Sequence, residues 1–296
     1  MSFQPCGIIP AMATPFSADG DLNEKALRQL TRYLIQGGVH GLFATSSQGE
    51  FWALTPNEKQ RVWEIVLDEA EGRVPVYAGT GGVTTREVRE LNRRAEAAGV
   101  DAVSIITPFY VRPTEVELEA HYCAIAEATS LPVLLYNNPG RTGGVNLSAE
   151  LVARLAEVDN IVGVKDSSGD LTLTTEYIRL TPEDFAVLSG RDTLIFAGLV
   201  HGTKGAIAAT ANVVPALVVE IYEAFHAGEM ERARRAQERL APLRLSFRLG
   251  SFPVVVKEAL ELMGIPAGPC RGPVGPLSPE KRAELRRVLV GMGLRV

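Results

Sequence analysis

Short runs of apolar residues recur eight times along the chain, and longer amphipathic segments separate them. Each run is continuously apolar and is bounded by turn-forming residues, which is typical of strands buried on both faces of a sheet. The interval between runs indicates strand–helix units rather than the repeats of a solenoid. The predicted strands lie at Gly7–Ala13, Gly41–Thr45, Val74–Gly79, Ala102–Thr107, Pro132–Asn137, Ile161–Lys165, Phe185–Gly190 and Gly205–Ala209.

Helix starts can be recognised between these runs. Thr55 and Glu58 have the spacing of a capping box, with Pro56 at the first helical position. The same spacing recurs at Thr84–Glu87 and at Thr114–Glu117. These signals predict helices that begin just after the three threonines.

Eight buried strands that alternate with helices fit either a closed barrel or an open doubly wound sheet. The length of 296 residues favours the barrel, because about 250 residues is typical of that fold. The pattern from Pro215 onward is helical only. We therefore predict an α/β protein with a (β/α)8 TIM barrel over residues 1–212, which holds the active site, and a C-terminal helical extension over residues 213–296.

Composition excludes several other classes of protein. The net charge of −5 leaves no basic surface for nucleic acid. No apolar run approaches the roughly 20 residues of a membrane span, and Met1–Pro5 lacks the features of a signal peptide. The three cysteines lie far apart, which argues against a disulfide framework or a zinc module. We expect a cytoplasmic protein that binds neither nucleic acid nor a membrane.

Functional residues of a barrel lie at the C-terminal ends of its strands. Lys165 ends a predicted strand, so its amine is expected in the barrel mouth, where a desolvated neutral amine can form a Schiff base with a carbonyl group. The structural alternative is a lysine that reaches water or pairs with Asp166. Tyr136 lies at the end of another predicted strand, and Tyr110 follows a third. Each fits either a proton relay or a ring that covers the rim.

Other polar segments leave alternatives open. Arg141 lies in a turn-rich loop, where it can bind a substrate carboxylate or hold the loop in place. Gly79–Thr84 is an incomplete dinucleotide fingerprint, so an oxidoreductase remains an alternative. Thr45–Gly49 matches only half of a nucleophile elbow. The four histidines have no metal-binding spacing.

Several motifs occur in a fixed order through essentially the whole chain. They are Thr14–Phe16, Ser47–Glu50, Gly79–Gly81, Thr107–Pro113, Tyr136–Gly143 and Val164–Asp166. This ordered set resembles the dihydrodipicolinate synthase / N-acetylneuraminate lyase family. The resemblance implies a class I, pyruvate-dependent aldolase barrel that needs no metal and no other cofactor, with a place in lysine biosynthesis.

The resemblance also implies roles for individual residues. Lys165 forms the imine with pyruvate, and Tyr136 carries protons at that imine. Ser47 and Tyr110 complete a hydroxyl relay. Tyr110 reaches into the site of a neighbouring subunit, which implies a homodimer, usually within a homotetramer. In the same way, backbone amides around Ser47 and Gln48 hold the pyruvate carboxylate.

The second substrate is an aldehyde. Ile207 lines the pocket, and Arg141 matches the arginine with which the synthase branch binds the carboxylate of aspartate semialdehyde. Gln48 departs from the usual synthase pattern, and so does Asp166, which stands where synthases usually have glutamate. We therefore predict a Schiff-base synthase that condenses pyruvate with aspartate semialdehyde. The alternatives are an aldolase or dehydratase of a 2-keto-3-deoxy sugar acid or a related 2-keto acid, and a catalytically idle sensor of keto acids.

Overall fold

The computed structural model describes residues 3–296. Met1 and Ser2, which belong to the Met1–Pro5 segment expected not to form a signal peptide, lie outside the described residues. Each predicted apolar run coincides with one strand of the structure. The strands are β1 (Gly7–Pro10), β2 (Leu42–Ala44), β3 (Val76–Gly79), β4 (Ala102–Ile106), β5 (Val133–Asn137), β6 (Ile161–Asp166), β7 (Ala186–Ser189) and β8 (Gly205–Ala208).

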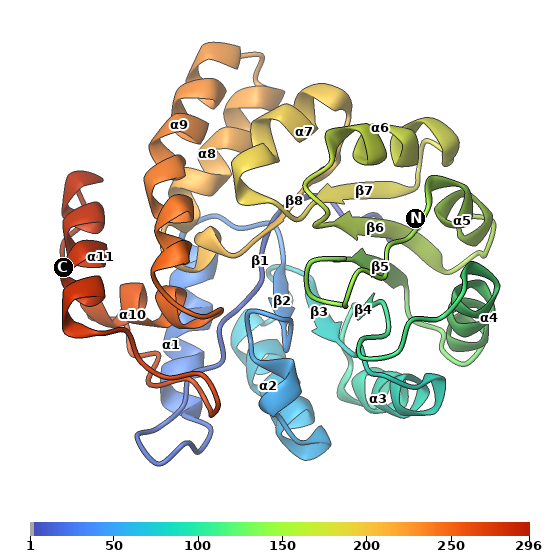
Figure 1. Cartoon of the computed structure of the whole chain (residues 1–296), viewed down its shortest axis with the longest axis horizontal. Helices are drawn as coiled ribbons and strands as arrows, with labels where there is room; N and C mark the ends of the chain where they lie inside the picture. The colour runs from blue at the N-terminus through green and yellow to red at the C-terminus, as the bar shows by residue number, and fades with distance from the viewer. Residues whose placement is uncertain (1–2) are drawn as a thin grey trace. The chain divides into compact units, whose positions relative to one another are not determined.

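The strands form one sheet in the order β1-β8-β7-β6-β5-β4-β3-β2 (Figure 1). The pairs from β3 to β8 are parallel, and a parallel bridge joins Ala11, the residue after β1, to Phe43 of β2. The sheet is therefore a nearly closed barrel, and the predicted TIM-barrel fold is confirmed. Seven of the strands are buried at every position, and β6 is buried at every position except Val162, as expected of a sheet covered on both faces.

Helices follow the strands in the expected alternation, and a helical segment ends the chain as predicted. Thr55 and Thr114 each form a complete capping box. Thr84 caps its helix too, but the carboxylate of Glu87 accepts its hydrogen bond from the Val83 amide, at 3.1 Å. The helices are α1 (Glu24–Gln36), α2 (Pro56–Ala70), α3 (Thr85–Ala98), α4 (Glu115–Ala126), α5 (Ala149–Leu155), α6 (Leu171–Leu180), α7 (Ile195–His201), α8 (Pro215–His226), α9 (Met230–Ser246), α10 (Val254–Leu262) and α11 (Pro279–Gly291).

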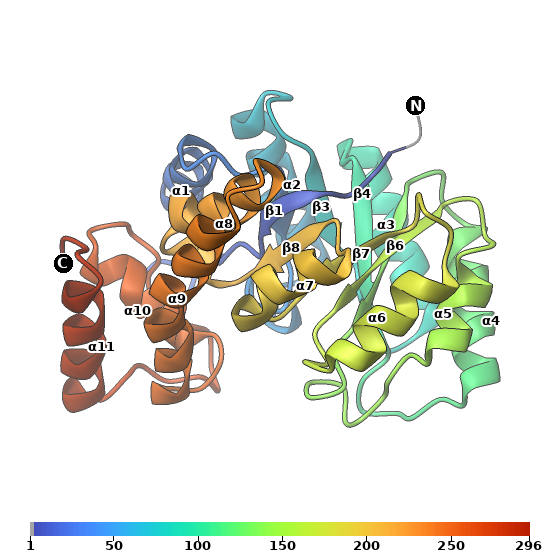
Figure 2. The same cartoon turned by 90° about the horizontal axis from the view of Figure 1, so that it is seen from above.

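The chain divides into two compact units. The first contains Tyr77–Ile207 and the described residues up to Gly7, and the second contains Ile8–Val76 and Ala208–Val296. In the first unit, α3 to α7 lie on the outer side of their strands (Figure 1). In the second unit, α8 packs against α9, and α11 packs against α9 and α10 (Figure 2). None of the helices within residues 3–296 has the length and apolarity that crossing a bilayer requires.

Candidate active site

The ends of β5 and β6 bring Lys165 and Tyr136 together in the first unit. The two residues are register partners on neighbouring parallel strands, so their side chains point to the same face of the sheet. The Lys165 Nζ atom lies 4.0 Å from the centre of the Tyr136 ring. Only 4% of Lys165 and 5% of Tyr136 is exposed. Lys165 is thus buried beside an aromatic ring and does not extend into water.

A buried hydrogen-bond network holds the opposite face of the same strand ends. Asp166 accepts hydrogen bonds from the Thr174 hydroxyl at 2.7 Å and from the Ser168 amide and hydroxyl at 2.9 Å. The Asn137 side chain donates to Asp166 at 3.3 Å and to the Tyr177 hydroxyl at 3.1 Å. Because successive side chains of a strand alternate between faces, this network fixes the backbone of Tyr136 and Lys165 from behind.

The loop after β5 contains two further polar residues of interest. The Asn138 side chain donates a hydrogen bond to the Tyr136 hydroxyl at 2.9 Å. The Asn138 carbonyl accepts from the backbone amides of Arg141 at 2.9 Å and Thr142 at 3.2 Å, so the loop is a tight turn. Arg141 lies at its exposed tip. The Asn138–Tyr136 contact was not predicted from the sequence, where the only available signal was a polar residue two positions after the tyrosine.

Ile207 lies on the same face of the sheet as Lys165. The register pairs Lys165 with Leu188, and Leu188 with Gly205. Ile207 is two residues beyond Gly205 on β8, so it returns to the same face, one step nearer the C-terminal end. It is fully buried, as expected for a residue that lines the interior of the barrel.

Tyr110 is placed differently from the other predicted catalytic residues. It follows β4 in the connection to α4, and 96% of it is exposed. Its φ of 75° lies in the left-handed region, which is costly for a bulky residue. The ring is thus held on a strained backbone without being buried against its own chain, and such strain is concentrated at functional sites.

Ser47 and Gln48 lie in the second unit, in the loop that follows β2. Both are buried. Gln48 donates from its side-chain nitrogen to the Pro253 carbonyl at 3.3 Å, whereas its side-chain oxygen is buried without a partner among the described residues. The loop is bounded by Thr45 and Glu50, whose φ values of 52° and 57° are left-handed.

A buried ion pair anchors the far end of this loop. Lys257 of α10 donates to the Glu50 carboxylate at 2.7 Å, and the two side chains are 1% and 0% exposed. Lys257 also donates to the Pro269 carbonyl at 2.7 Å and lies 4.2 Å from the centre of the Phe16 ring. The Arg271 amide donates to the other oxygen of Glu50 at 2.9 Å. Burial lowers the pKa of Lys257, and the adjacent Glu50 opposes that effect. The sequence contained no signal for this pair.

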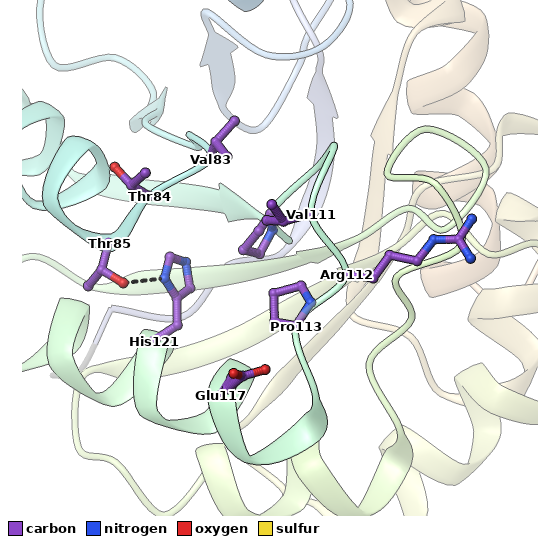
Figure 3. Close-up of a pocket in the computed structure, with 9 residues that line it drawn as sticks. Val83, Thr84, Thr85, Val111, Arg112, Pro113, Glu117 and His121 are labelled. Carbon is purple, nitrogen blue, oxygen red and sulfur yellow. Dashed lines mark hydrogen bonds between the residues drawn. The ribbon is translucent and has the colours of Figure 1, made fainter.

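An open cavity of about 480 Å³ lies in the first unit, between the N-terminal parts of α3 and α4 and the loop after β4 (Figure 3). His121 lines it and shares a hydrogen bond of 2.8 Å with the Thr85 hydroxyl. Burial lowers the pKa of His121 to about 4, so the ring is neutral near pH 7. Within residues 3–296, no three His, Cys, Asp or Glu side chains are grouped so that they could hold a metal ion.

A lysine buried at the end of a barrel strand beside a tyrosine is the arrangement of a barrel lyase that forms a Schiff base with a carbonyl substrate. The chain belongs to the dihydrodipicolinate synthetase family, whose model matches residues 4–291. The predicted family and the predicted class of enzyme, a lyase, are therefore confirmed.

Individual relatives cover nearly the full length of the chain. A Methanopyrus kandleri protein named 4-hydroxy-tetrahydrodipicolinate synthase is 44% identical over 296 residues, which cover 99% of this chain and 98% of that protein. The crystal structure of dihydrodipicolinate synthase from Aquifex aeolicus has a TM-score of 0.95 at 33% identity and covers 99% of both chains. The structure of YagE from E. coli K12, in complex with pyruvate, has a TM-score of 0.94 at 34% identity and covers 98% of this chain and 99% of that one.

Proposed function

We propose that the protein condenses pyruvate with aspartate semialdehyde through an imine on Lys165. The observation that carries this proposal is the burial of Lys165 against Tyr136 at the paired ends of β5 and β6. Relatives named 4-hydroxy-tetrahydrodipicolinate synthase support the overall reaction, and the pyruvate complex of YagE supports pyruvate as the first substrate.

The reaction begins when the Lys165 amine attacks the ketone carbon of pyruvate. Loss of water gives the protonated imine, which withdraws electrons from the neighbouring methyl group. A methyl proton is then lost, and the resulting enamine carbon forms a bond to the carbonyl carbon of the aldehyde, whose oxygen takes up a proton and becomes a hydroxyl group. Water finally adds to the imine carbon and releases the amine. Tyr136 is the proposed carrier of protons at the imine, because its ring lies 4.0 Å from the lysine nitrogen.

The remaining site residues have more specific proposed roles. Ser47 and Tyr110 complete the hydroxyl relay, and backbone amides around Ser47 and Gln48 bind the pyruvate carboxylate. Arg141 binds the carboxylate of the aldehyde. Its position at the exposed tip of the loop suits this role, because the aldehyde binds after pyruvate has formed the imine. These roles rest on the resemblance to the family.

Tyr110 is proposed to act in the site of a second subunit. Its high exposure and left-handed backbone support this role, because a partner surface would bury the ring. The protein is therefore proposed to be a homodimer, or a homotetramer built from two such dimers.

The alternative substrate is a 2-keto-3-deoxy sugar acid or a related 2-keto acid. The side-chain oxygen of Gln48 is buried and has no partner within residues 3–296, which favours a ligand that presents a hydrogen-bond donor. Asp166, which departs from the usual synthase pattern, does not share the face of Lys165. Its carboxylate is engaged by Asn137, Ser168 and Thr174 on the face of β6 opposite to Lys165.

The test is reduction with borohydride in the presence of pyruvate, followed by mass spectrometry of the peptides. The expected result is a reduced pyruvate adduct on Lys165 that is absent from Lys165→Ala. Lys204→Ala is a matched control, because Lys204 is exposed, and it should retain the adduct. An adduct that is absent from the folded parent protein, or that persists in Lys165→Ala, would refute the mechanism. Turnover with aspartate semialdehyde, compared with sugar-acid substrates, then distinguishes the two proposed reactions.

A further inference from the structure

The Tyr136 hydroxyl oxygen accepts a hydrogen bond from a residue of the loop that follows β5. The Asn138 side-chain amide donates to this oxygen at 2.9 Å. Tyr136 is 5% exposed, and Asn138 is partly buried, so water screens the contact poorly. The pair lies at the end of β5, next to Lys165.

The backbone of Asn138 is fixed independently of this contact. Its carbonyl accepts hydrogen bonds from the amides of Arg141 and Thr142, and from the Thr142 hydroxyl at 3.1 Å. The same hydroxyl also donates to the Val145 carbonyl at 3.1 Å. The turn therefore holds the Asn138 amide in position against the tyrosine, and the donor does not have to be ordered when substrate binds.

A donor on a phenol oxygen has two chemical effects. It engages one lone pair, which directs the O–H proton of the phenol away from the donor. It also stabilises the phenolate more than the phenol, because a hydrogen bond to an ionised acceptor is the stronger one. A tyrosine that must give up and recover a proton at an imine benefits from both effects.

We propose that Asn138 is a positioning residue that orients the Tyr136 hydroxyl and makes it a better proton donor. This inference rests on the proposed function, in which Tyr136 carries protons at the Lys165 imine. Asn138 acts through the tyrosine and is not assigned a contact with substrate. Nothing in the resemblance assigns this position a role.

The first experiment measures the ionisation of Tyr136 directly. NMR of protein with labelled tyrosine, with the Tyr136 signal identified from Tyr136→Phe, gives the pH midpoint of its titration. Asn138→Leu removes the donor, and the midpoint should rise by about 1 pH unit. Asn138→Asp, which is nearly isosteric but puts a carboxylate beside the phenol, should raise it further. An unchanged midpoint in both variants would overturn the proposal.

The second experiment measures the consequence for turnover. In Asn138→Leu we expect kcat to fall about 10-fold. We also expect the alkaline limb of the pH profile to move to higher pH, by the same amount as the Tyr136 titration midpoint. In the Tyr136→Phe background the same change should have no further effect on kcat, since the two residues act as a unit. Full additivity of the two losses would refute a role through the tyrosine.

Thr142→Val is the matched control for the turn. It removes the hydroxyl that donates to Asn138 and Val145 but leaves the Asn138 amide in place. We expect it to reduce stability without moving the pH profile. A shift equal to that of Asn138→Leu would mean that loop structure, and not the amide donor, is responsible. Borohydride trapping on Lys165 in the parent protein tests the proposed function separately, because a trapped adduct shows that the imine forms whatever the effect of Asn138 on the rate of proton transfer.

Discussion

Removal of the Lys257 ammonium is expected to be one of the most destabilising changes outside the catalytic residues. In Lys257→Met, the carboxylate of Glu50 remains 0% exposed and loses its counter-charge at 2.7 Å. Breaking a buried pair from one side costs about 3–5 kcal/mol. The hydrogen bond to Pro269 and the contact with the Phe16 ring are lost as well. A typical protein has a free energy of unfolding of about 5–15 kcal/mol, so the loss is a large fraction of the total.

A second variant separates electrostatics from packing. In the double variant Lys257→Met with Glu50→Gln, no unpaired charge is buried, and the side-chain oxygen of the introduced glutamine can still accept from the Arg271 amide. We therefore expect the double variant to be more stable than Lys257→Met by about 1–3 kcal/mol. Lys281→Met is the control, because Lys281 is exposed on α11, and its stability should match that of the parent.

The assay is urea unfolding at one protein concentration, followed by tryptophan fluorescence. Trp63 is a suitable probe, because it is fully buried in the same unit and donates to the Thr45 hydroxyl at 2.7 Å. Two results would refute the reasoning. One is a loss of less than about 1 kcal/mol in Lys257→Met, and the other is a double variant that is no more stable than the single one.

Three further predictions concern individual side chains. Tyr136→Phe should retain a slow turnover, with a kcat about 10²–10⁴-fold below that of the parent in steady-state assays. A kcat equal to that of the parent would exclude the role assigned to Tyr136. Arg141→Ala should raise KM for the aldehyde while borohydride trapping of pyruvate is unchanged; loss of trapping would contradict its assignment to the second substrate. Between its unfolded pKa of about 6.5 and its folded pKa of about 4, His121 binds a proton only in the unfolded chain. Stability should therefore fall by roughly 2–3 kcal/mol as the pH falls through that range. Urea midpoints near pH 7 and near pH 5 should show this component in the parent and lack it in His121→Gln, whereas equal pH dependence would exclude it.

Features that depend on neighbours in the sequence were predictable from the sequence. The strands were recognised because a strand buried on both faces must be apolar throughout, and helix starts at Thr55 and Thr114 were recognised because capping boxes are local. The lysine at the end of β6 followed from the same logic, since the strand boundary places it at the barrel mouth. Its pairing with Tyr136 needed the β5–β6 register as well, which the structure supplies.

Contacts between distant segments were not predictable in this way. Glu50 and Lys257 are separated by 207 positions, and neither residue carries a local signal of its partner. The surroundings of Asp166 were not predictable for a related reason. The sequence shows that it adjoins Lys165, but adjacent strand residues point to opposite faces, so its carboxylate joins Asn137 and Thr174. The contact of Asn138 with Tyr136 depends on a turn and a side-chain rotamer, which the residue types alone do not determine.

The role proposed for Tyr110 in a second subunit would make catalysis depend on the concentration of the enzyme. If this hydroxyl serves the site of another copy, an isolated chain lacks one member of its relay, however well Lys165 and Tyr136 are arranged. The specific activity then falls on dilution, once the protein concentration drops below the dissociation constant of the dimer. The cell could thus lower the output of each chain by making fewer chains, without any inhibitor.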